Sequence, residues 1–545
     1  MPLGGLGHVG GNMMVYETVD DLIVVDCGIL FPTADQPGVD YIIPDISYVL
    51  DRRDKLRAYI LTHGHEDHLG ALPYVFPEAP APVYGTPFTL ALLQNKLTEH
   101  PDLDLTTRPM NDREPFTLGD FRIDPIPVTH SIPQAVALAI WTPAGCVVHT
   151  GDFKLDAEPL DGRMTDLDAF RALGESGVTA LLSDSTNAER SGHTWGERQV
   201  AGTLEELITG APRRVFVTTF ASHMHRIQTL LDASHRAGRK VMPVGRSVTR
   251  NIQLGLEKGI LKTSFAALRD PTDFDKIRPE HLTVIASGSQ GEPRSAMTRI
   301  AAGQHGHVRI EPGDRIILSS RRIPGNERAI GKMVNNMWRL GADVIDDRLA
   351  RVHASGHAFN DEQRHILDLC RPRFFVPIHG EYRHLVRHAS IARQAGVAEE
   401  RIFVIEDGQP LELTRNGDTV DMRRGEPVSS GHVFVDGKGI GDVGEIVLRD
   451  RRVLAKTGIV LCVVILGDDG SLVDEPHIVT RGVIHVDANP ELMERAVACV
   501  RQLFEGDDPC VDVNDCSEQV RLTLRRFFRR ELDRRPLILP VIMEL

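Results

Sequence analysis

The sequence lacks any long apolar segment. The longest clean apolar run of the 545 residues, 459–466, is far shorter than the about 20 residues that a membrane-spanning helix needs. The first residues, MPLGGLGHVGG, have neither the basic start nor the apolar stretch of a signal peptide. We therefore expect no membrane partner and a cytoplasmic location.

The sequence also has few cysteines and no excess of positive charge. The seven cysteines include no pair at CxxC spacing, which argues against a disulfide framework and a cysteine zinc site and favours free thiols. The formal net charge is −14, so the chain is not an obvious nucleic-acid binder. A polyanionic ligand would need a local basic groove or bound metal ions.

The composition is otherwise that of a soluble globular protein, with 41% apolar and 25% charged residues. Its length corresponds to three or four domains of roughly 100–200 residues. Short apolar runs end in Asp26, His63, Asp152, Asp184 or His379. We interpret them as buried strands of an α/β layered protein whose functional residues lie along one sheet edge. These runs are 22–25, 58–62, 146–149, 180–182 and 374–378.

Two further regions have their own pattern. Strands and helices alternate between 215 and 340, which predicts a doubly wound α/β domain inserted into the first domain. After a connector rich in glycine and aspartate, the chain predicts a small α+β domain. The arginine-rich segment 521–535 reads as a solvated helix face, with an RNA or subunit contact as alternatives. The last domain is expected to contain strands 459–466, 472–480, 483–486 and 537–543 and helices 490–504 and 515–533.

The strongest signal is the segment His63-Gly-His65-Glu-Asp67-His68, directly after a predicted strand. Neutral imidazole suits zinc and similar divalent ions, and an aspartate at this spacing can serve a second ion. A tight turn brings such side chains to one point, so we interpret the segment as part of a metal centre.

One turn cannot complete two metal sites, and strand ends elsewhere supply further candidates. These are His130, Asp152 and His379, each after an apolar strand. Asp152 is the natural bridge, because a carboxylate has two oxygens. Two ions about 3.5–4 Å apart would lower the pKa of a shared water and clamp both oxygens of a phosphodiester.

These residues also resemble a known family. HTHGHEDHLGA, with His130, Asp152 and His379, resembles the metallo-β-lactamase superfamily. Asp184 in SDSTN and the segment HASGH, which ends at His357, narrow the resemblance to its β-CASP branch, which processes nucleic acids. PLGGLGHVGGNM, FPTADQPGVDYIIPD, TTFASHMHR and PIHGEYRHL resemble bacterial ribonuclease J nearly end to end.

The resemblance implies a fold and a domain order. It implies a metallo-β-lactamase αββα sandwich with an inserted doubly wound α/β β-CASP domain and a small C-terminal α+β domain. We expect the sandwich over 1–205 and 349–430, with the inserted domain over 206–348. A linker would follow over 431–450, and the C-terminal domain over 451–545.

The resemblance also implies residue roles. One metal, zinc or manganese, would be held by His63, His65 and His130, and the other by Asp67, His68 and His379, with Asp152 shared. His357 would be the general acid and Asp184 would orient it, because a histidine beside a carboxylate keeps its proton nearer neutral pH. Asp26 would orient a metal-binding histidine or, equally, cap a turn.

Substrate contacts are implied as well. A pocket for a 5′ monophosphate would use Ser222, His223, His353, Ser355 and Gly356, together with His357. Arg246, Arg250, Arg321 and Arg322 are candidates for RNA backbone contacts, and a structural calcium ion would lie between Asp40 and Asp436.

The leading hypothesis is therefore a two-metal ribonuclease with 5′→3′ exonuclease and endonuclease activity, in mRNA decay and rRNA maturation. It would form a homodimer or tetramer and could meet other RNA-decay proteins. One alternative is a small-molecule metallo-hydrolase of the same fold, such as a lactonase. The other is a non-catalytic RNA-processing subunit, although such relatives lose metal ligands and every ligand position is filled here.

Overall fold

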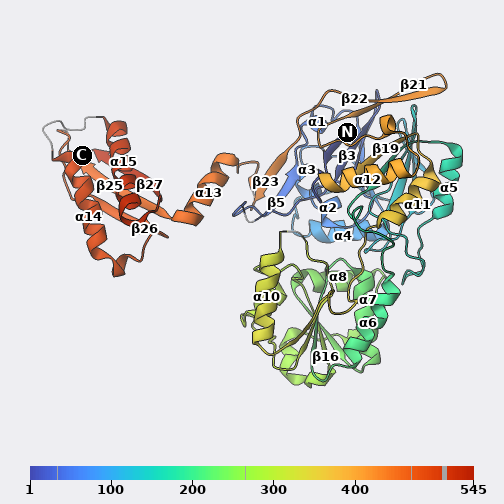
Figure 1. Cartoon of the computed structure of the whole chain (residues 1–545), viewed down its shortest axis with the longest axis horizontal. Helices are drawn as coiled ribbons and strands as arrows, with labels where there is room; N and C mark the ends of the chain where they lie inside the picture. The colour runs from blue at the N-terminus through green and yellow to red at the C-terminus, as the bar shows by residue number, and fades with distance from the viewer. Residues whose placement is uncertain are drawn as a thin grey trace. The chain divides into compact units, whose positions relative to one another are not determined.

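The computed structural model divides the chain into two compact units (Figure 1). The first comprises Met1–Leu30 with Ile42–Val433, and the second Phe31–Tyr41 with Phe434–Leu545. The structure describes residues 1–33, 35–263, 265–323, 325–437, 439–467, 469–505 and 512–544.

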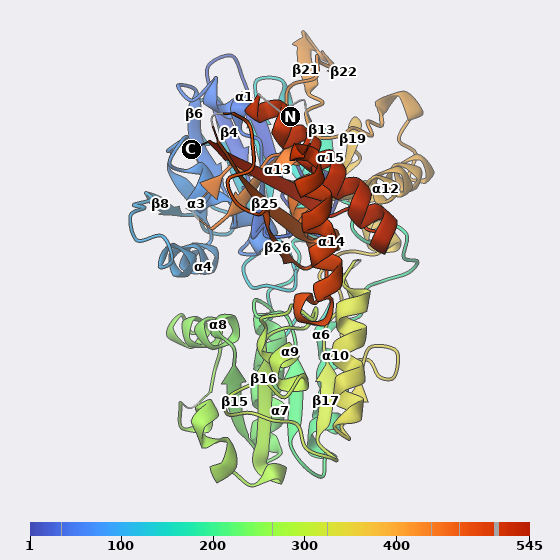
Figure 2. The ribbon, with the colours of Figure 1, turned by 90° about the vertical axis from the view of Figure 1, so that its left-hand side faces the viewer.

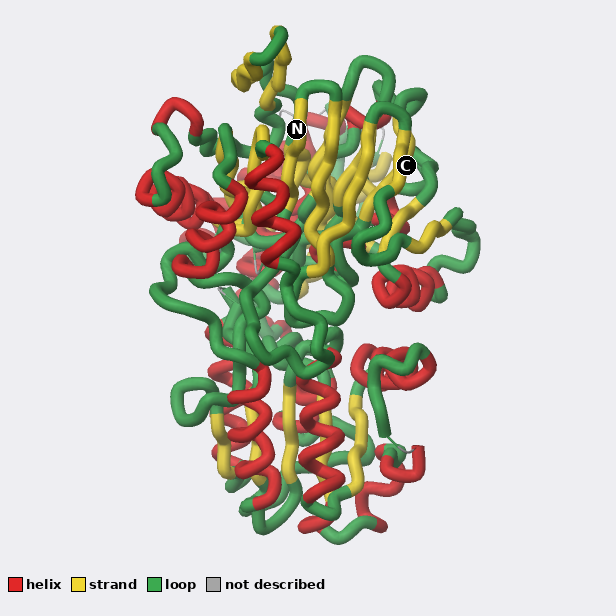
Figure 3. The backbone as a smooth tube through the Cα atoms, turned by 90° about the vertical axis from the view of Figure 1, so that its right-hand side faces the viewer, coloured by secondary structure: helices red, strands yellow, loops and turns green. Residues whose placement is uncertain are grey.

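Two six-stranded sheets form the centre of the first unit (Figure 3). The first contains, in spatial order, β1 (Pro2–Gly4), β3 (Met13–Glu17), β4 (Leu22–Val25), β6 (Leu56–Ile60), β7 (Val83–Gly85) and β8 (Thr107–Pro109). The second contains β19 (Phe374–Ile378), β13 (Val178–Asp184), β12 (Gly145–His149), β11 (Val136–Thr142), β10 (Phe121–Pro127) and β9 (Phe116–Leu118).

The sheets share one hydrophobic core. Ile23 and Ile60 of the first sheet belong to the same buried cluster as Leu138 and Val376 of the second. The opposite face of the second sheet packs against Phe170, Ile366 and Ile391. These three residues lie on α5 (Leu167–Ser176), α11 (Asn360–Cys370) and α12 (Tyr382–Gln394), while α4 (Pro87–Leu97) contacts β7 and β8.

The inserted region is a five-stranded sheet with every neighbouring pair parallel (Figure 2). Its order is β15 (Lys240–Val244), β16 (Leu282–Ala286), β14 (Val215–Thr218), β17 (Arg315–Leu318) and β18 (Asp343–Ile345). The alternation expected from the sequence is confirmed, although β18 and α6 (Glu197–Thr209) were not foreseen. The main helices are α7 (Met224–Arg236), α8 (Arg246–Glu257), α9 (Ala296–Ala301) and α10 (Glu327–Arg339).

The second unit contains a three-stranded sheet with β25 (Ile459–Leu466) between β26 (His477–Arg481) and β27 (Leu537–Glu544). The strand predicted at 483–486 is wrong, because Gly482 adopts a positive φ of 71° after β26 and a 3-10 turn, Val486–Ala488, follows. Apolar residues of α14 (Pro490–Arg501) and α15 (Val513–Leu532) cover one sheet face. Helix α13 (Glu445–Thr457) begins within the expected connector.

Two expectations from composition can be compared with the structure. Within its described part, the chain has no helix that combines the length and apolar character needed to span a membrane. The expectation of free thiols is wrong for Cys516, which is disulfide-bonded. Disulfide formation depends on the separation of the cysteines in space, which CxxC spacing alone does not decide.

Candidate metal centre

The chemistry-bearing residues lie where strands of the two sheets end. His63 follows β6, and Asp67 and His68 lie on the short helix α2 (Glu66–Leu69). Asp152 follows β12 and His379 follows β19. The structure thus brings residues far apart in the sequence to one sheet edge, as expected.

Three histidines converge on one side of Asp152. We call His63, His65 and His130 the three-histidine group. His65 Nδ1 lies 3.0 Å from His63 Nε2 and 3.1 Å from His130 Nε2. Asp152 Oδ2 lies 3.6 Å from His63 Nε2 and 3.7 Å from His130 Nε2.

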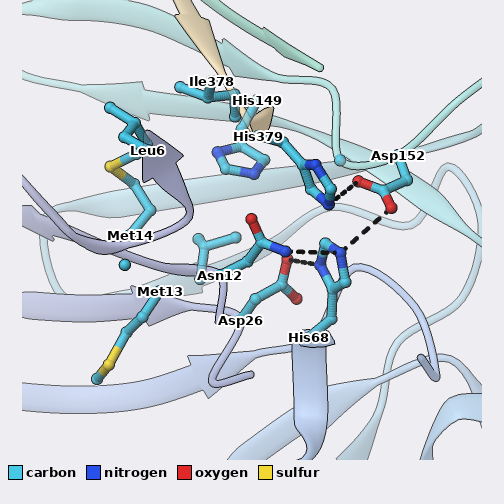
Figure 4. Close-up of a pocket in the computed structure, with 13 residues that line it drawn as sticks. Leu6, Asn12, Met13, Met14, Asp26, His68, His149, Asp152, Ile378 and His379 are labelled. Atoms are coloured by element: carbon cyan, nitrogen blue, oxygen red, sulfur yellow. Dashed lines mark hydrogen bonds and ion pairs between the residues drawn. The ribbon is translucent and has the colours of Figure 1, made fainter. Parts of the chain in front are cut away.

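Asp67, His68 and His379, which we call the mixed group, form a second cluster with Asp152. Figure 4 shows the rings of His68 and His379 beside the Asp152 carboxylate. His68 Nε2 lies 3.2 Å from Asp152 Oδ2, and His379 Nε2 lies 3.4 Å from Asp152 Oδ1. Asp67 Oδ2 is 3.5 Å from His379 Nε2. Asp152 therefore contacts both groups, as a bridging carboxylate must.

The second ring nitrogen of each of two histidines in the three-histidine group has a neutral partner. His130 Nδ1 donates to the carbonyl oxygen of Gly356 at 2.7 Å, and His63 Nδ1 contacts the Thr62 hydroxyl at 3.0 Å. These bonds fix the tautomer that leaves Nε2 unprotonated and aimed inward. A Cβ added at Gly356 would lie 2.6 Å from the His130 ring, so only glycine fits this approach.

In the mixed group, too, the ring partners lead to carboxylates, as does the Thr62 hydroxyl beside His63, which donates to Asp26 Oδ2 at 2.8 Å. His68 Nδ1 donates to Asp26 Oδ2 at 2.8 Å, and Asp26 Oδ1 also accepts from the backbone N–H of Thr62 at 2.8 Å, so Asp26 makes the contacts of both roles expected of it. His379 Nδ1 contacts the Thr186 hydroxyl at 2.9 Å, and that hydroxyl donates to Asp184 Oδ1 at 2.7 Å. Asp26 and His379 both adopt positive φ, 61° and 52°, which is uncommon for residues other than glycine and is found at functional sites.

Burial sets the charge of the three-histidine group. It lowers the pKa of His65 to about 4 and holds the pKa values of His63 and His130 well below their usual range. The imidazoles are therefore neutral near pH 7. Nε2 of His63 and Nε2 of His130 both lie next to His65 Nδ1, and neutral imidazole nitrogens that face one point in this way fit a divalent ion.

Carboxylates set the charge of the mixed group. Burial alone would lower the pKa of His379, but Asp152, Asp67 and Asp184 outweigh it and raise that pKa to about 9. The same balance raises the pKa of His68 above its usual range. Among the described residues, Asp152 Oδ1 and His379 Nε2 have no hydrogen-bond partner although they are buried and lie 3.4 Å apart. Unpaired buried donors and acceptors of this kind also fit a metal ion.

His357 lies beside both groups. Its Nδ1 donates to Asp184 Oδ2 at 2.8 Å and is 3.8 Å from Asp152 Oδ2. Burial lowers the pKa of His357, but the nearby carboxylates of Asp184 and Asp152 outweigh it and raise that pKa. A histidine that keeps its proton in this position can act as a general acid.

Asn187, which the sequence analysis missed, connects two of the expected substrate contacts. Its Nδ2 donates to Ser355 Oγ at 2.8 Å and to the carbonyl oxygen of His357 at 3.0 Å. Asn12 was missed as well, and its Nδ2 contacts His68 Nε2 at 3.1 Å. Only their places in SDSTN and GGNM could have pointed to them.

His223 lies in a buried ionic network rather than in the open. Its side chain is 1% exposed, its Nδ1 caps α7, and its Nε2 lies 3.3 Å from Glu197 Oε1. Glu197 Oε2 also accepts from Arg226 at 2.9 Å, and Lys154 lies 3.6 Å from Glu197 Oε1. Ser222 is half-buried beside this network. Local sequence patterns gave no sign of the Glu197 and Arg226 pair.

The other arginines expected to contact the RNA backbone have different surroundings. Arg250 pairs with Glu99 at 2.7 Å and Arg322 with Asp346 at 2.9 Å, while Arg246 is exposed.

The two aspartates expected to hold calcium have protein partners. Asp436 is ion-paired with Arg451, and Asp40 Oδ2 accepts from the backbone N–H of Gly437 at 2.9 Å. Neither belongs to a cluster of three possible metal-binding residues in the described ranges. The calcium site stays a prediction.

Comparison with family models gives four matches. Residues 6–188 match the metallo-beta-lactamase superfamily, and residues 212–337 match the ribonuclease J beta-CASP domain. Residues 344–404 match the Zn-dependent metallo-hydrolase RNA specificity domain, and residues 446–545 match the ribonuclease J C-terminal domain.

Curated relatives match over nearly the whole chain. Ribonuclease J of Thermus thermophilus is 39% identical and covers 100% of this chain and 95% of that protein. Ribonuclease J 1 of Streptococcus pyogenes is 37% identical (99% and 96%), and ribonuclease J2 of Bacillus subtilis is 36% identical (99% and 98%). A solved structure of a protein of unknown function from Enterococcus faecalis shares the fold, with a TM-score of 0.52, 15% identity and coverage of 74% and 97%.

Proposed function

The chain belongs to the ribonuclease J family, and we propose that it is a two-metal ribonuclease that hydrolyses RNA phosphodiester bonds. The resemblance and the expected fold class are thereby confirmed. The observation that carries the proposal is Asp152, whose carboxylate contacts the three-histidine group and the mixed group at once.

Each group would hold one divalent ion, zinc or manganese, with Asp152 between them. When bound, such a pair of ions lowers the pKa of a water molecule and stabilises the attacking and leaving oxygens of a phosphodiester. The protein supplies the geometry: the bonds to Asp26, Thr62 and the Gly356 carbonyl hold the imidazole rings in place.

His357 would give its proton to the leaving oxygen. Asp184 holds Nδ1 of the ring at 2.8 Å, which leaves Nε2 to face the substrate. The same carboxylate reaches His379 through Thr186. One residue therefore orients both the proposed acid and one proposed metal ligand.

We further propose that the enzyme degrades RNA from a 5′ monophosphate and also cuts internally. The end pocket would lie at Ser355 and Gly356, near His357, with Ser222 at its margin. His223 and His353 would support this pocket through the buried network, because His223 is occupied by Glu197. In the cell this activity would serve mRNA decay and rRNA maturation, and its RNA substrate would place it in the cytoplasm.

The domain division stays a proposal with the boundaries expected from the sequence.

Oligomerisation would use the second unit. On β27, Leu539, Val541 and Met543 are 37–50% exposed, and they pair in register with Leu461, Val463 and Ile465 of β25. An aliphatic sheet face of this kind favours contact with a second copy. Replacing Val541 with lysine should shift the molar mass measured by light scattering to that of a monomer, whereas an unchanged mass would contradict this interface.

The test of function uses RNA labelled at its 3′ end that carries either a 5′ monophosphate or a 5′ triphosphate. The purified full chain is incubated with each RNA in manganese, in zinc and in chelator. Metal-dependent digestion that favours the monophosphate would support the proposal. Internal cuts that ignore the 5′ end would contradict the end pocket, and no cleavage in any metal would contradict the nuclease itself.

A further inference from the structure

Trp195 is a large aromatic side chain that stays exposed next to a cation. The exposed fraction of the residue is 45%, and the guanidinium carbon of Arg351 lies 3.5 Å from the centre of its ring. At this distance a guanidinium stacks on an aromatic face and is attracted by the ring electrons. Because nearly half of the residue remains open to solvent, the arginine covers the indole only in part.

The stacked guanidinium is not neutralised by an acid. Arg351 is exposed, and no carboxylate in the described ranges lies within ion-pair distance of it, whereas the nearby Arg348 pairs with Asp346 at 2.7 Å. An aromatic ring beside an unpaired cation matches a ligand that carries both a flat ring and a negative charge. A nucleotide has both features.

The other two tryptophans lie in different surroundings. Trp141, on β11, is half-buried, and its Nε1 donates to Asp124 at 2.9 Å. Trp338, on α10, is 53% exposed, but no guanidinium among the described residues lies over its ring. Single exposed apolar side chains are common on protein surfaces. Exposure alone therefore does not set Trp195 apart, whereas its cation and its location do.

The residue before Trp195 contacts the segment that carries the proposed acid. Thr194 Oγ1 donates to the carbonyl oxygen of His357 at 2.9 Å. The backbone N–H of Thr194 donates to Glu362 Oε2 at 2.8 Å, and Glu362 is buried. Trp195 therefore follows directly a residue that is fixed against His357, which places the indole beside the metal centre.

The backbone beside Arg351 is fixed as well. The carbonyl oxygen of Val352, the next residue, accepts from Arg226 Nη1 at 2.7 Å and from Ser319 Oγ at 2.6 Å. Both Val352 and Arg226 are fully buried. Ring and cation are thus presented from positioned backbone, and a preorganised aromatic group loses little conformational entropy when it binds a ligand.

The loop that leads to Trp195 is also held at its start. Asn187 Nδ2 donates to Ser355 Oγ and to the carbonyl oxygen of His357, and Asn187 Oδ1 accepts from Arg321 Nη1 at 2.7 Å. Arg321, one of the arginines expected to contact the RNA backbone, is therefore engaged by the same loop.

We propose that Trp195, with Arg351 on its ring, is a stacking platform for a nucleobase of the RNA substrate beside the metal centre. The inference rests on the proposed ribonuclease function and deepens it, because the contacts expected from the sequence are to phosphates and this one is to a base. Every base has an aromatic face, so such a platform holds RNA without sequence preference.

Tryptophan fluorescence tests the contact directly, because a base stacked on an indole quenches its emission. A short single-stranded 2′-O-methyl RNA is titrated into the full chain in chelator, so that binding is measured without cleavage. The RNA should quench the emission of the wild type and of Trp338→Phe, and should quench Trp195→Phe far less. Quenching that survives in Trp195→Phe would overturn the proposal.

A double-mutant cycle separates stacking from a merely structural role of the ring. One abasic position is moved along the RNA, and affinity is measured by fluorescence anisotropy of a dye at its 3′ end. In the wild type one position should weaken binding by about 5–150-fold, the range for one stacked base. In Trp195→Ala the same abasic position should cause little further loss.

Trp338→Ala is the matched control for this cycle, because it removes an exposed tryptophan of the inserted domain. The abasic position should cost the full factor in this variant. Additive losses in Trp195→Ala would show that the ring contacts no base and would overturn the proposal.

Failure of the proposed function gives a different result. Wild-type protein that binds RNA and shows the cycle, but cleaves no unmodified RNA in manganese or zinc, would contradict the ribonuclease function and leave the stacking contact standing. Wild-type protein that cleaves RNA, without quenching that depends on Trp195, would contradict the stacking contact alone.

Discussion

The two halves of the metal centre share Asp152 but differ in charge. The three-histidine group is buried and neutral, and its ring partners include the Gly356 carbonyl. The mixed group is rich in carboxylates, and His379 has a pKa of about 9. The three-histidine group can therefore bind a divalent ion without losing protons, whereas the mixed group must release protons when an ion binds.

The largest effect should follow from removing what the halves share. Asp152→Ala should eliminate binding of both ions and reduce cleavage below detection, because neither group keeps its bridging oxygen. Metal content by mass spectrometry and RNA cleavage measure the two losses. Retained cleavage would show that Asp152 does not bridge the ions.

His357→Ala should separate chemistry from metal binding. The variant should keep both ions and lower kcat by about 10²–10⁴-fold, the usual contribution of a general acid. Single-turnover cleavage and metal content are measured on the same sample. Loss of an ion would make His357 a ligand and change the division into two halves.

Asp26→Asn should weaken the mixed group most, because Asp26 contacts His68 directly and reaches His63 only through the Thr62 hydroxyl. Asp26 holds His68 Nδ1 at 2.8 Å, and loss of such a partner costs about 10–100-fold in metal affinity. Calorimetric titration should show one strongly weakened site and one site that changes less. Asp51→Asn, at an exposed aspartate, is the control. Equal weakening of both sites would contradict the comparison.

The smallest effect concerns pH. In the metal-free protein His379 is protonated below about pH 9, so an ion that enters the mixed group displaces a proton. Its affinity should rise by up to about tenfold between pH 7 and 8, while the three-histidine group changes little. Calorimetry in buffers of different ionisation enthalpy counts the released protons. Equal proton release at both sites would contradict the assigned charges.

Local motifs explain why most of the residues that converge around Asp152 could be predicted to lie together. The turn from His63 to His68 carries four candidate ligands within six residues, and strand-end positions supplied His130, Asp152 and His379. Short apolar runs gave β4, β6, β12, β13 and β19 of the two sheets and β14 to β17 of the inserted domain, because buried strands read as continuous apolar runs.

The missed features are contacts between distant segments. Asn187 and Ser355 lie 168 positions apart, and the Arg226 to Glu197 pair joins two helix starts that no local pattern relates. The strand predicted at 483–486 failed because a glycine in a left-handed conformation outweighed a short apolar run. Tertiary context decides such cases, since side-chain pairing depends on the completed fold.

The central claim is that two ions lie on either side of Asp152. Crystals of the full chain grown with manganese and measured at its absorption edge test this most directly. The account predicts two anomalous peaks about 3.5–4 Å apart, one at the three-histidine group and one at the mixed group. A single peak at saturating metal and pH 8, or peaks away from Asp152, would contradict it.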